Sequence, residues 1–358
     1  LKRSDSGRPN AREMIARMVD PGSFMELGTL VGGVSYHGEA TVAADALVGG
    51  LARIDGRPVV IGCEDFTSAG GSIGHGANAK RVRLAHLARD SRCPYVMVLD
   101  GAGARVSNSL ERHPYAPNDL QVLAELSGLV PTVAVVLGSS AGHGVLTGLL
   151  MDYIIALEDA TLFSAGPPLV AAAMGEMVSK EELGSAAMHA RESGVVHNLA
   201  RDAAHAAELL RGYLSHLPSH AWERAPRASG ADPGPRTLAD IFQLIPRNHQ
   251  RPYDMRPVIA RVADAGAFYE FQPAYGTSLV TGFIHLGGHS CVVVANQPAV
   301  QAGAITAQAA EKAAHFIELA DAWHLPVLFL ADNPGIMPGT QAERAGTLRA
   351  AARMFAAP

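Results

Sequence analysis

The chain contains two copies of one sequence segment, and this duplication restricts the folds that it can adopt. Over residues 48–103, 13 of the 56 residues recur identically 232 positions further along the chain, and the alignment has no gap. The matched pairs include Gly71 and Gly303, Lys80 and Lys312, and Asp100 and Asp332. Upstream, IARMVDPGSFMEL at 15–27 matches IARVADAGAFYEF at 259–271. Because self-similarity at a fixed spacing marks a repeated structural unit, we expect a duplicated domain.

Length and composition fit a two-domain globular protein. The 358 residues are 48% hydrophobic and 18% charged, which suits a chain with a large core. The net charge of -5 gives no reason to expect binding to nucleic acid. Cys63, Cys93 and Cys291 form no Cys-x-x-Cys motif, and their odd number argues against a disulfide-built secreted protein. The N-terminus lacks the apolar core of a signal peptide, so we expect a cytoplasmic location.

One apolar segment raises the question of a membrane span. Residues 126–151 contain no Asp, Glu, Lys or Arg and are long enough to cross a bilayer. However, the segment also contains Pro131, several glycines and, near its middle, His143. A strand, a glycine turn and a helix beginning at Gly144 explain this pattern better than a transmembrane helix, so no membrane association is expected.

Apolar periodicity predicts α/β domains with mostly parallel strands. Strands are expected at 48–54, 58–63, 95–99, 132–137, 153–157, 279–286, 291–295 and 327–331. Helices are expected at 11–19, 78–89, 200–217 and 307–322. A Pro- and Gly-rich linker after the helix at 200–217 predicts an N-terminal domain over 1–236 and a C-terminal domain over 237–358. The repeat places the partner of 138–144 beyond residue 358, so we expect the second domain to be incomplete in this chain.

Three glycine-rich loops follow predicted strands. They are GAGAR at 101–105, GSSAGHG at 138–144 and DNPGIMPG at 332–339. Ligands bind at the carboxyl ends of strands in parallel sheets. The loop at 138–144 should begin a helix, whose free N–H groups favour negative charge. Two such amides can stabilise an oxyanion or an enolate, although simple tight turns remain the alternative.

Two other readings of these segments stay open. Lys80 and Arg81 could contact a phosphate or a carboxylate, or they could lie on a solvated helix face. Residues 138–142 also fit the G-x-S-x-G nucleophile elbow of a serine hydrolase, with Ser140 as the nucleophile. Candidate triad partners are Asp202, His205, Asp264 and His289. A serine hydrolase would give no reason for the duplication. Separately, the 15 histidines lack the spacing of metal ligands, so no metal site is expected.

Longer motifs along nearly the whole chain resemble one family. They are DPGSFMELG at 20–28, LGSSAGHG at 137–144, FSAGPPLV at 163–170, GEMVSKEELG at 175–184, ESGVVHN at 192–198, ANQPAVQAGAITAQAAEKAAHFIELADAW at 295–323 and FLADNPGIMPGTQAERAG at 329–346. The chain thereby resembles the carboxyltransferase (beta) subunit of biotin-dependent acyl-CoA carboxylases, which act on acetyl-, propionyl- and methylcrotonyl-CoA.

This resemblance implies a fold, an assembly and a reaction. The fold would be tandem crotonase-like domains, in hexamers where the N-terminal half of one subunit faces the C-terminal half of another. Acyl-CoA would bind the N-terminal half. Carboxybiotin, borne by a biotin carboxylase or carrier (alpha) subunit, would enter from the C-terminal half and supply both the carbon dioxide and the base. An acyl-CoA decarboxylase or a non-catalytic carboxylase subunit is the alternative within this fold.

The resemblance also implies site residues. The amides of Gly142 and His143 would hold the enolate oxygen, and His143 stands where the family usually has a second glycine. The implied substrate-binding residues are Gly71, Ser72, Lys80, Gly101, Ala102, Gly103, Ala104, Arg105, Ala141 and Gly166. The implied biotin-side residues are Gly303, Gly335, Ile336, Pro338 and Gly339.

Overall fold

The computed structural model describes residues 10–32, 44–105, 118–229, 237–248, 250–264 and 268–357. Two units can be distinguished. The first consists of Leu1–His189 and Leu199–Arg211, and the second of Ala190–Asn198 and Gly212–Pro358. The predicted domain boundary after residue 236 adjoins 230–236, which lie outside the described residues. That boundary therefore stays a prediction.

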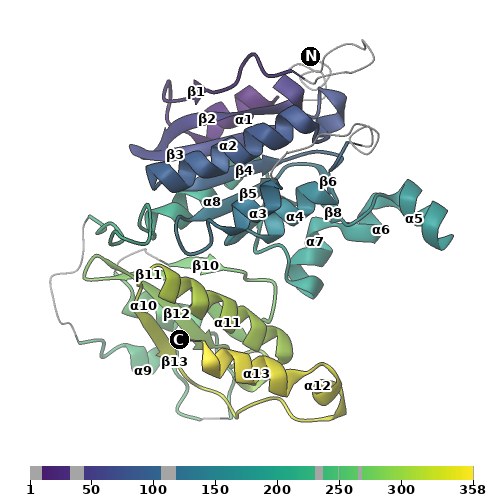
Figure 1. Ribbon diagram of the computed structural model, residues 1–358. Helices are drawn as coiled ribbons and strands as arrows, with labels where there is room; N and C mark the ends of the chain where they lie inside the picture. The colour runs from purple at the N-terminus through teal and green to yellow at the C-terminus, as the bar shows by residue number, and fades with distance from the viewer. Residues whose placement is uncertain are drawn as a thin grey trace. The chain divides into compact units, whose positions relative to one another are not determined.

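The first unit is built on a seven-stranded sheet in the order β1-β2-β3-β4-β5-β7-β9 (Figure 1). The strands are β1 (Met25–Glu26), β2 (Leu47–Ile54), β3 (Arg57–Glu64), β4 (Tyr95–Leu99), β5 (Thr132–Val136), β7 (Tyr153–Leu157) and β9 (Asn198–Ala200). Strands β1 to β3 pair antiparallel, whereas β3, β4, β5 and β7 pair parallel. Every residue of β4 and β5 is buried, which explains their unbroken apolar sequences.

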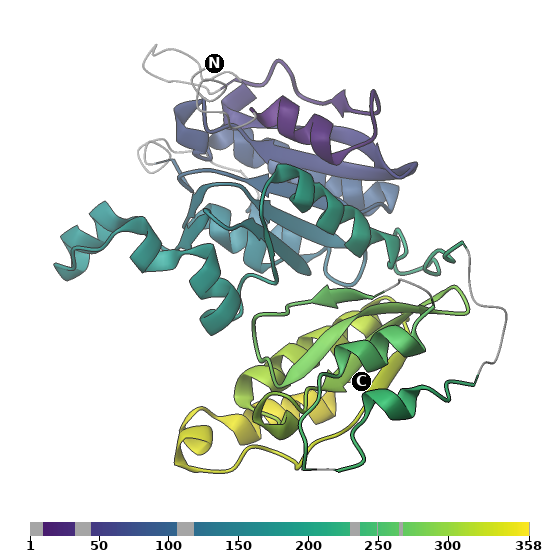
Figure 2. The same cartoon turned by 180° about the vertical axis from the view of Figure 1, so that it is seen from behind.

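Helices cover both faces of this sheet. Helix α2 (His75–Ser91) contacts β2 and β3 on one face, and α1 (Ala11–Met18) contacts the same strands on the other (Figures 1 and 2). Helix α1 begins with a capping box, in which the Asn10 side chain accepts from the Glu13 amide at 3.0 Å. The other helices of this part are α3 (Asp119–Ala124), α4 (His143–Leu149), α5 (Pro167–Met174), α6 (Lys180–Gly184), α7 (Ala186–Met188) and α8 (Ala203–Ser215).

Two features differ from the sequence expectation. The stretch 138–144 is more than a turn, because β6 (Ser139–Ala141) pairs in parallel with β8 (Thr161–Phe163) before α4 begins. Helix α5 contains no buried residue and projects from the first unit in both views.

The segment 126–151 is divided among β5, β6 and α4. Within the described ranges, no helix is long and apolar enough to cross a membrane.

The second unit repeats the start of the first. Its sheet has the order β10-β11-β12-β13, with β10 (Tyr269–Phe271), β11 (Leu279–Leu286), β12 (His289–Asn296) and β13 (Val327–Leu330). Only β12 and β13 are parallel, so the expectation of mostly parallel pairing is wrong for this described sheet. Its helices are α9 (Ile241–Leu244), α10 (Arg256–Val262), α11 (Ala307–Ala322), α12 (Thr340–Arg344) and α13 (Thr347–Ala356). Figure 1 shows α11 against one sheet face, and Figure 2 shows α10 on the other.

The repeat is reproduced at the level of single hydrogen bonds. Lys80 is buried in α2, and its Nζ donates to the Leu47 carbonyl of β2 at 2.8 Å. At the equivalent place in the second unit, the Nζ of buried Lys312 donates to the Leu279 carbonyl at 2.6 Å. The alternative of a solvated helix face is therefore wrong for Lys80. Each lysine ties a helix to the first long strand of its sheet.

Candidate active site

Two of the predicted loops lie side by side in the first unit. The amide of Ala102 donates to the Gly70 carbonyl at 3.1 Å, and the amide of Ile73 donates to the Gly103 carbonyl at 2.8 Å. A third bond runs from the Arg105 amide to the Ile73 carbonyl at 3.0 Å. The predicted substrate-binding segments 71–72 and 101–105 are thus one continuous backbone surface beyond β4.

Glycine is required where these loops touch. Gly71 has a φ of +67°, and a Cβ there would lie 2.4 Å from the Asp100 carbonyl oxygen. Gly103 has a φ of +78°, and a Cβ there would lie 2.5 Å from the Ala141 oxygen and 3.4 Å from the His143 amide nitrogen. A side chain at either position would push the loops apart. The close approach at Gly103 brings loop 101–105 against the start of α4.

The start of α4 presents the His143 amide to this surface. The Ala141 amide donates to the Gly101 carbonyl at 3.2 Å, which extends the contact between the two loops. The Gly142 amide donates to the Phe163 carbonyl at 3.0 Å and is therefore engaged in this structure. His143 is the first residue of α4, where the N–H has no acceptor inside the helix. Of the two predicted enolate-hole donors, His143 has the available amide, and the role of Gly142 stays a prediction.

A buried charged network lies behind both loops. Arg81 forms an ion pair with Glu64 and lies 3.7 Å from the Asp119 carboxylate, and all three side chains are buried. Arg81 also donates to the Thr147 hydroxyl of α4 at 3.1 Å. The second oxygen of Glu64 accepts the Asp100 amide at 2.7 Å. One guanidinium therefore links the base of loop 101–105 to α4, and Arg81 meets carboxylates of the protein itself.

The electrostatics of Glu64 follow from its burial. Removal from water raises the pKa of the Glu64 carboxyl above its ordinary value. Arg81 acts in the opposite direction, as does the hydrogen bond from the Asp100 amide. Because the guanidinium also contacts Asp119, this network holds two carboxylates around one fixed positive charge.

The His143 side chain joins the same network. Its Nε2 lies 2.7 Å from Asp119 Oδ1, and 23% of the side chain is exposed. The Thr147 hydroxyl, which accepts from Arg81, donates to the His143 carbonyl at 3.1 Å. The imidazole is thus held by a buried carboxylate at the residue whose amide faces loop 101–105.

The other predicted substrate-side residues fall into two groups. Arg105 donates to the Ser72 hydroxyl at 3.1 Å and forms an ion pair of 2.5 Å with buried Asp45, which fixes the outer end of the loop. Ala104 pairs with Ile73 in an isolated β-bridge within the same surface. Lys80 is not brought to this surface, since its ammonium binds the Leu47 carbonyl. Gly166 precedes α5 at the end of the segment that follows β8.

The predicted biotin-side residues gather in the second unit. Ile305 forms a parallel bridge with Ile336, and its amide donates to the Gly335 carbonyl at 3.0 Å. A Cβ on Gly303 would lie 2.5 Å from the Asp332 carbonyl oxygen. Gly335 and Ile336 line a pocket of about 550 Å³ together with apolar side chains such as Phe329 and Met354 and the polar side chains of Asn296 and Asn333. Pro338 and Gly339 follow, and Gly339 precedes α12.

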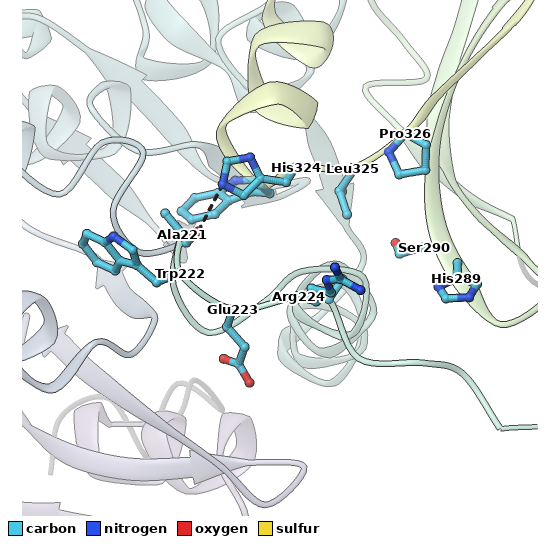
Figure 3. Close-up of a pocket in the computed structure, with 11 residues that line it drawn as sticks. Ala221, Trp222, Glu223, Arg224, His289, Ser290, His324, Leu325 and Pro326 are labelled. Atoms are coloured by element: carbon cyan, nitrogen blue, oxygen red, sulfur yellow. Dashed lines mark hydrogen bonds between the residues drawn. The ribbon is translucent and has the colours of Figure 1, made fainter.

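A second pocket of the second unit lies at the other ends of the same strands (Figure 3). It has a volume of about 620 Å³ and is lined by Trp222, Arg224, His289, Ser290 and His324, among others. His289 begins β12, and Pro326 directly precedes β13. The pocket therefore lies away from the loop 332–339 that follows β13.

The serine hydrolase reading fails on geometry. Ser140 is fully buried inside β6, and its hydroxyl has no hydrogen-bond partner within the described residues. A nucleophilic serine needs an exposed hydroxyl within hydrogen-bond reach of a base. Among the proposed partners, the His205 amide is bound to Asp202 Oδ1 at 2.8 Å. No triad is formed around Ser140 in the described part of the chain.

Comparison with known proteins decides the family. The carboxyl transferase domain family matches residues 2–357. Methylmalonyl-CoA decarboxylase subunit alpha of Veillonella parvula is 34% identical over 99% of this chain and 70% of its own. The propionyl-CoA carboxylase beta chain of Saccharopolyspora erythraea is 34% identical over 99% of this chain and 67% of its own. The chain belongs to the carboxyl transferase domain family.

A solved structure agrees with this assignment. The transcarboxylase 12S subunit, described as a hexamer with methylmalonyl-CoA and methylmalonic acid bound, superimposes with a TM-score of 0.94. It is 33% identical to this carboxyl transferase chain and is covered over 70% of its length. The predicted relation to acyl-CoA carboxylase beta subunits and the predicted crotonase-like α/β fold are confirmed.

Sequence reasoning missed the charged network of this carboxyltransferase. Glu64, Arg81, Asp119 and His143 come from β3, α2, α3 and α4, and no local motif joins them. The resemblance implies a role for the His143 amide but none for its imidazole. In the described residues, no group of three or more His, Cys, Asp or Glu side chains is placed to hold a metal ion.

Proposed function

We propose that this protein transfers the carboxyl group of carboxybiotin, borne by a carrier protein, to the α-carbon of an acyl-CoA. One observation carries the proposal beyond family membership. The free amide at the start of α4 faces the glycine loop 101–105, with Gly103 packed against Ala141 and His143. A helix N-terminus next to exposed backbone is suited to a negatively charged oxygen.

The chemistry follows from where charge develops. Carboxylation at the α-carbon passes through a thioester enolate, whose oxygen carries the negative charge. The His143 amide is fixed by the helix and needs no reorganisation to donate to that oxygen. Carboxybiotin supplies the carbon dioxide. Residues of the chain bind and orient the thioester, with loop 101–105 along its acyl end and Ser72 and Arg105 at the outer edge.

We assign the acyl-CoA side to the N-terminal domain, 1–236, and the biotin side to the C-terminal domain, 237–358. The pocket beside Gly335 and Ile336 supports the second assignment. Its apolar walls and its volume of about 550 Å³ suit a small bicyclic ring with an apolar tail. Pro338 and Gly339 follow in the same loop, and Gly303 packs against its start at the Asp332 carbonyl.

The partners we propose are a biotin carrier with its biotin carboxylase, and further copies of this chain or a related beta subunit in a hexamer. Exposed apolar side chains on and after α5 support self-association. Leu169, Met174 and Met177 are all exposed, although they are apolar. Exposed apolar side chains gathered in one segment are typical of protein–protein contact. A cytoplasmic location remains a prediction.

The test is the reverse half-reaction, carboxyl transfer from malonyl-CoA or methylmalonyl-CoA to free biotin. His143→Ala keeps the amide, whereas His143→Pro removes it at the first helical position, which tolerates proline. We expect His143→Pro to be slower than His143→Ala by about 10²–10³-fold, the usual contribution of one oxyanion donor. Equal rates for the two variants would refute the role of this amide. A wild-type protein that binds acyl-CoA without transfer would indicate a non-catalytic subunit.

A decarboxylase is the second candidate, because one relative is a methylmalonyl-CoA decarboxylase subunit. Release of carbon dioxide that depends on free biotin would favour it over net transfer.

A further inference from the structure

His143 places two different groups at one point of the site. Its amide begins α4, and its imidazole is attached to the same residue. If the amide binds the oxygen of an enolate, the thioester carbon and the α-carbon bonded to it lie close to the residue that carries the ring. Proton transfer requires a group within hydrogen-bond reach of the reacting atom, and carrying both groups on one residue keeps the ring close to an enolate bound by the amide.

The imidazole is oriented as a proton-transfer group requires. Asp119 holds Nε2 at 2.7 Å. In the described parts of the chain, Nδ1 has no hydrogen-bond partner. With 23% of its side chain exposed, the ring is not sealed inside the protein. A buried carboxylate on one ring nitrogen and a free second nitrogen form the base–orienter pair of general acid–base catalysis.

Asp119 is itself fixed. Arg81 lies 3.7 Å from its carboxylate and also holds the Thr147 hydroxyl, which donates to the His143 carbonyl. The imidazole therefore has little freedom to rotate away from Asp119. A lone surface histidine would not be supported from both its side chain and its backbone in this way.

The duplication shows that this loop can be held without the charges of Glu64 and Arg81. In the second unit, Asn296 stands at the place of Glu64, and its side chain accepts the Asp332 amide at 3.2 Å. This is the bond that Glu64 makes to the Asp100 amide. Ala313 stands at the place of Arg81, so the second copy holds the same loop with neutral groups. Within the repeated segment 48–103, the charges of Glu64 and Arg81 belong to the first copy alone.

We propose that His143 donates a proton to the α-carbon of the bound enolate, so that the site decarboxylates a 2-carboxyacyl-CoA without biotin. The bond between the α-carbon and the carboxylate breaks, and its electron pair forms the enolate held by the His143 amide. Carbon dioxide leaves. The protonated imidazole then gives its proton to the α-carbon, a C–H bond forms, and solvent reprotonates the ring. This inference rests on the proposed function, because it uses the same enolate.

The experiment uses the full chain with methylmalonyl-CoA in D₂O and no biotin. Mass spectrometry follows the formation of propionyl-CoA with deuterium at the α-carbon, after subtraction of the enzyme-free rate. We compare wild type with His143→Gln, which keeps a polar side chain beside Asp119 but cannot relay a proton. The matched control is His86→Gln, on α2 and outside the site. Carboxyl transfer to free biotin and acyl-CoA binding are measured on the same samples.

We expect His143→Gln to lose about 10²–10⁴ of the biotin-independent rate, the usual contribution of a positioned acid or base, and to lose less of the transfer rate. His86→Gln should behave as wild type. Equal biotin-independent rates in wild type and His143→Gln would overturn the inference, as would a wild type that transfers carboxyl groups without any biotin-independent product. If the wild-type protein catalyses neither reaction and does not bind acyl-CoA, the proposed function is refuted, and the inference with it.

Discussion

The ion pair between Arg81 and Glu64 gives the most direct test of how this site is held. Arg81→Met keeps the aliphatic length of the side chain and removes its charge. Both partners are buried, so the change leaves Glu64 without its counter-ion and Asp119 without its neighbour. Breaking one partner of a buried pair typically costs about 3–5 kcal/mol. We expect the first unit to lose stability in this range.

The second copy predicts how that loss can be reversed. Asn296 and Ala313 stand at the equivalent positions, and the equivalent loop keeps its bond to the strand. In Glu64→Gln/Arg81→Met, the side-chain oxygen of the new glutamine can still accept a hydrogen bond from the Asp100 amide. Position 64 then carries no unpaired negative charge. Replacing a whole buried pair with neutral residues is often neutral or stabilising. We therefore expect the double variant to be clearly more stable than Arg81→Met alone.

The pH dependence has a definite sign. Burial raises the pKa of Glu64, and Arg81 opposes that rise. In Arg81→Met the pKa of Glu64 rises further, and the native state takes up a proton more readily than the unfolded state. A carboxyl with a raised native pKa loses its stabilising contribution as pH rises through that pKa. The destabilisation by Arg81→Met should therefore be smaller at pH 5 than at pH 8.

The assay must report the first unit. Both tryptophans, Trp222 and Trp323, lie in the second unit, so tryptophan fluorescence is unsuitable. Hydrogen exchange measured by mass spectrometry resolves peptides from α2 and α4. A loss of about 3 kcal/mol corresponds to roughly a hundredfold faster opening. Unchanged exchange in Arg81→Met, or no recovery in the double variant, would show that this pair does not hold the two loops.

Three further predictions follow from single positions. Burial lowers the pKa of Lys312 to about 7. Between that pH and the ordinary lysine pKa the unfolded chain binds more protons than the native one, so the free energy of unfolding rises with pH. Lys312→Met should flatten this rise in denaturation followed by tryptophan fluorescence, whereas the control Lys180→Met should not. Gly56→Ala should lower the free energy of unfolding by about 1–2 kcal/mol through its positive φ alone. Gly71→Ala should lower it further, because of the two added Cβ atoms only the one at position 71 would clash with backbone. Melting temperatures of the two variants check this. Burial raises the pKa of Asp152 to about 6, so its contribution to stability is lost as pH rises through 6, and Asp152→Asn should remove that loss from the stability–pH profile.

Local pattern predicted most of the regular structure. Strands β4, β7 and β11 and helix α11 have the bounds that apolar periodicity gave them. Apolar runs bounded by turn residues are strong signals because burial on both faces leaves no room for polar side chains. The register of the internal repeat also held, since Lys80 and Lys312 make equivalent bonds. These features depend on neighbours within a few residues or on a fixed spacing.

What the sequence did not predict depends on contacts between distant elements. The bond from His143 to Asp119 joins two helices, and neither residue has a motif that names its partner. The engagement of the Gly142 amide depends on Phe163, whose position is fixed by pairing of β6 with β8. A short strand inside a glycine-rich loop leaves no periodic signal, because three residues cannot show an alternation. Which amide is free could therefore be decided only from coordinates.

The two copies differ in charge where they agree in backbone, and this difference bears on function. In both units a strand-end side chain holds the first amide of a glycine loop, Glu64 in one and Asn296 in the other. Within the repeated segment, Arg81 is replaced by Ala313, and in the first unit Arg81 joins Asp119 and the His143 imidazole in a buried charged network. Burying charge is unfavourable, and within the repeated segment the second copy holds the same loop with neutral groups. The charged network is best explained by what it does to the groups at the start of α4, and the Arg81 and His143 variants separate its structural effect from its chemical one.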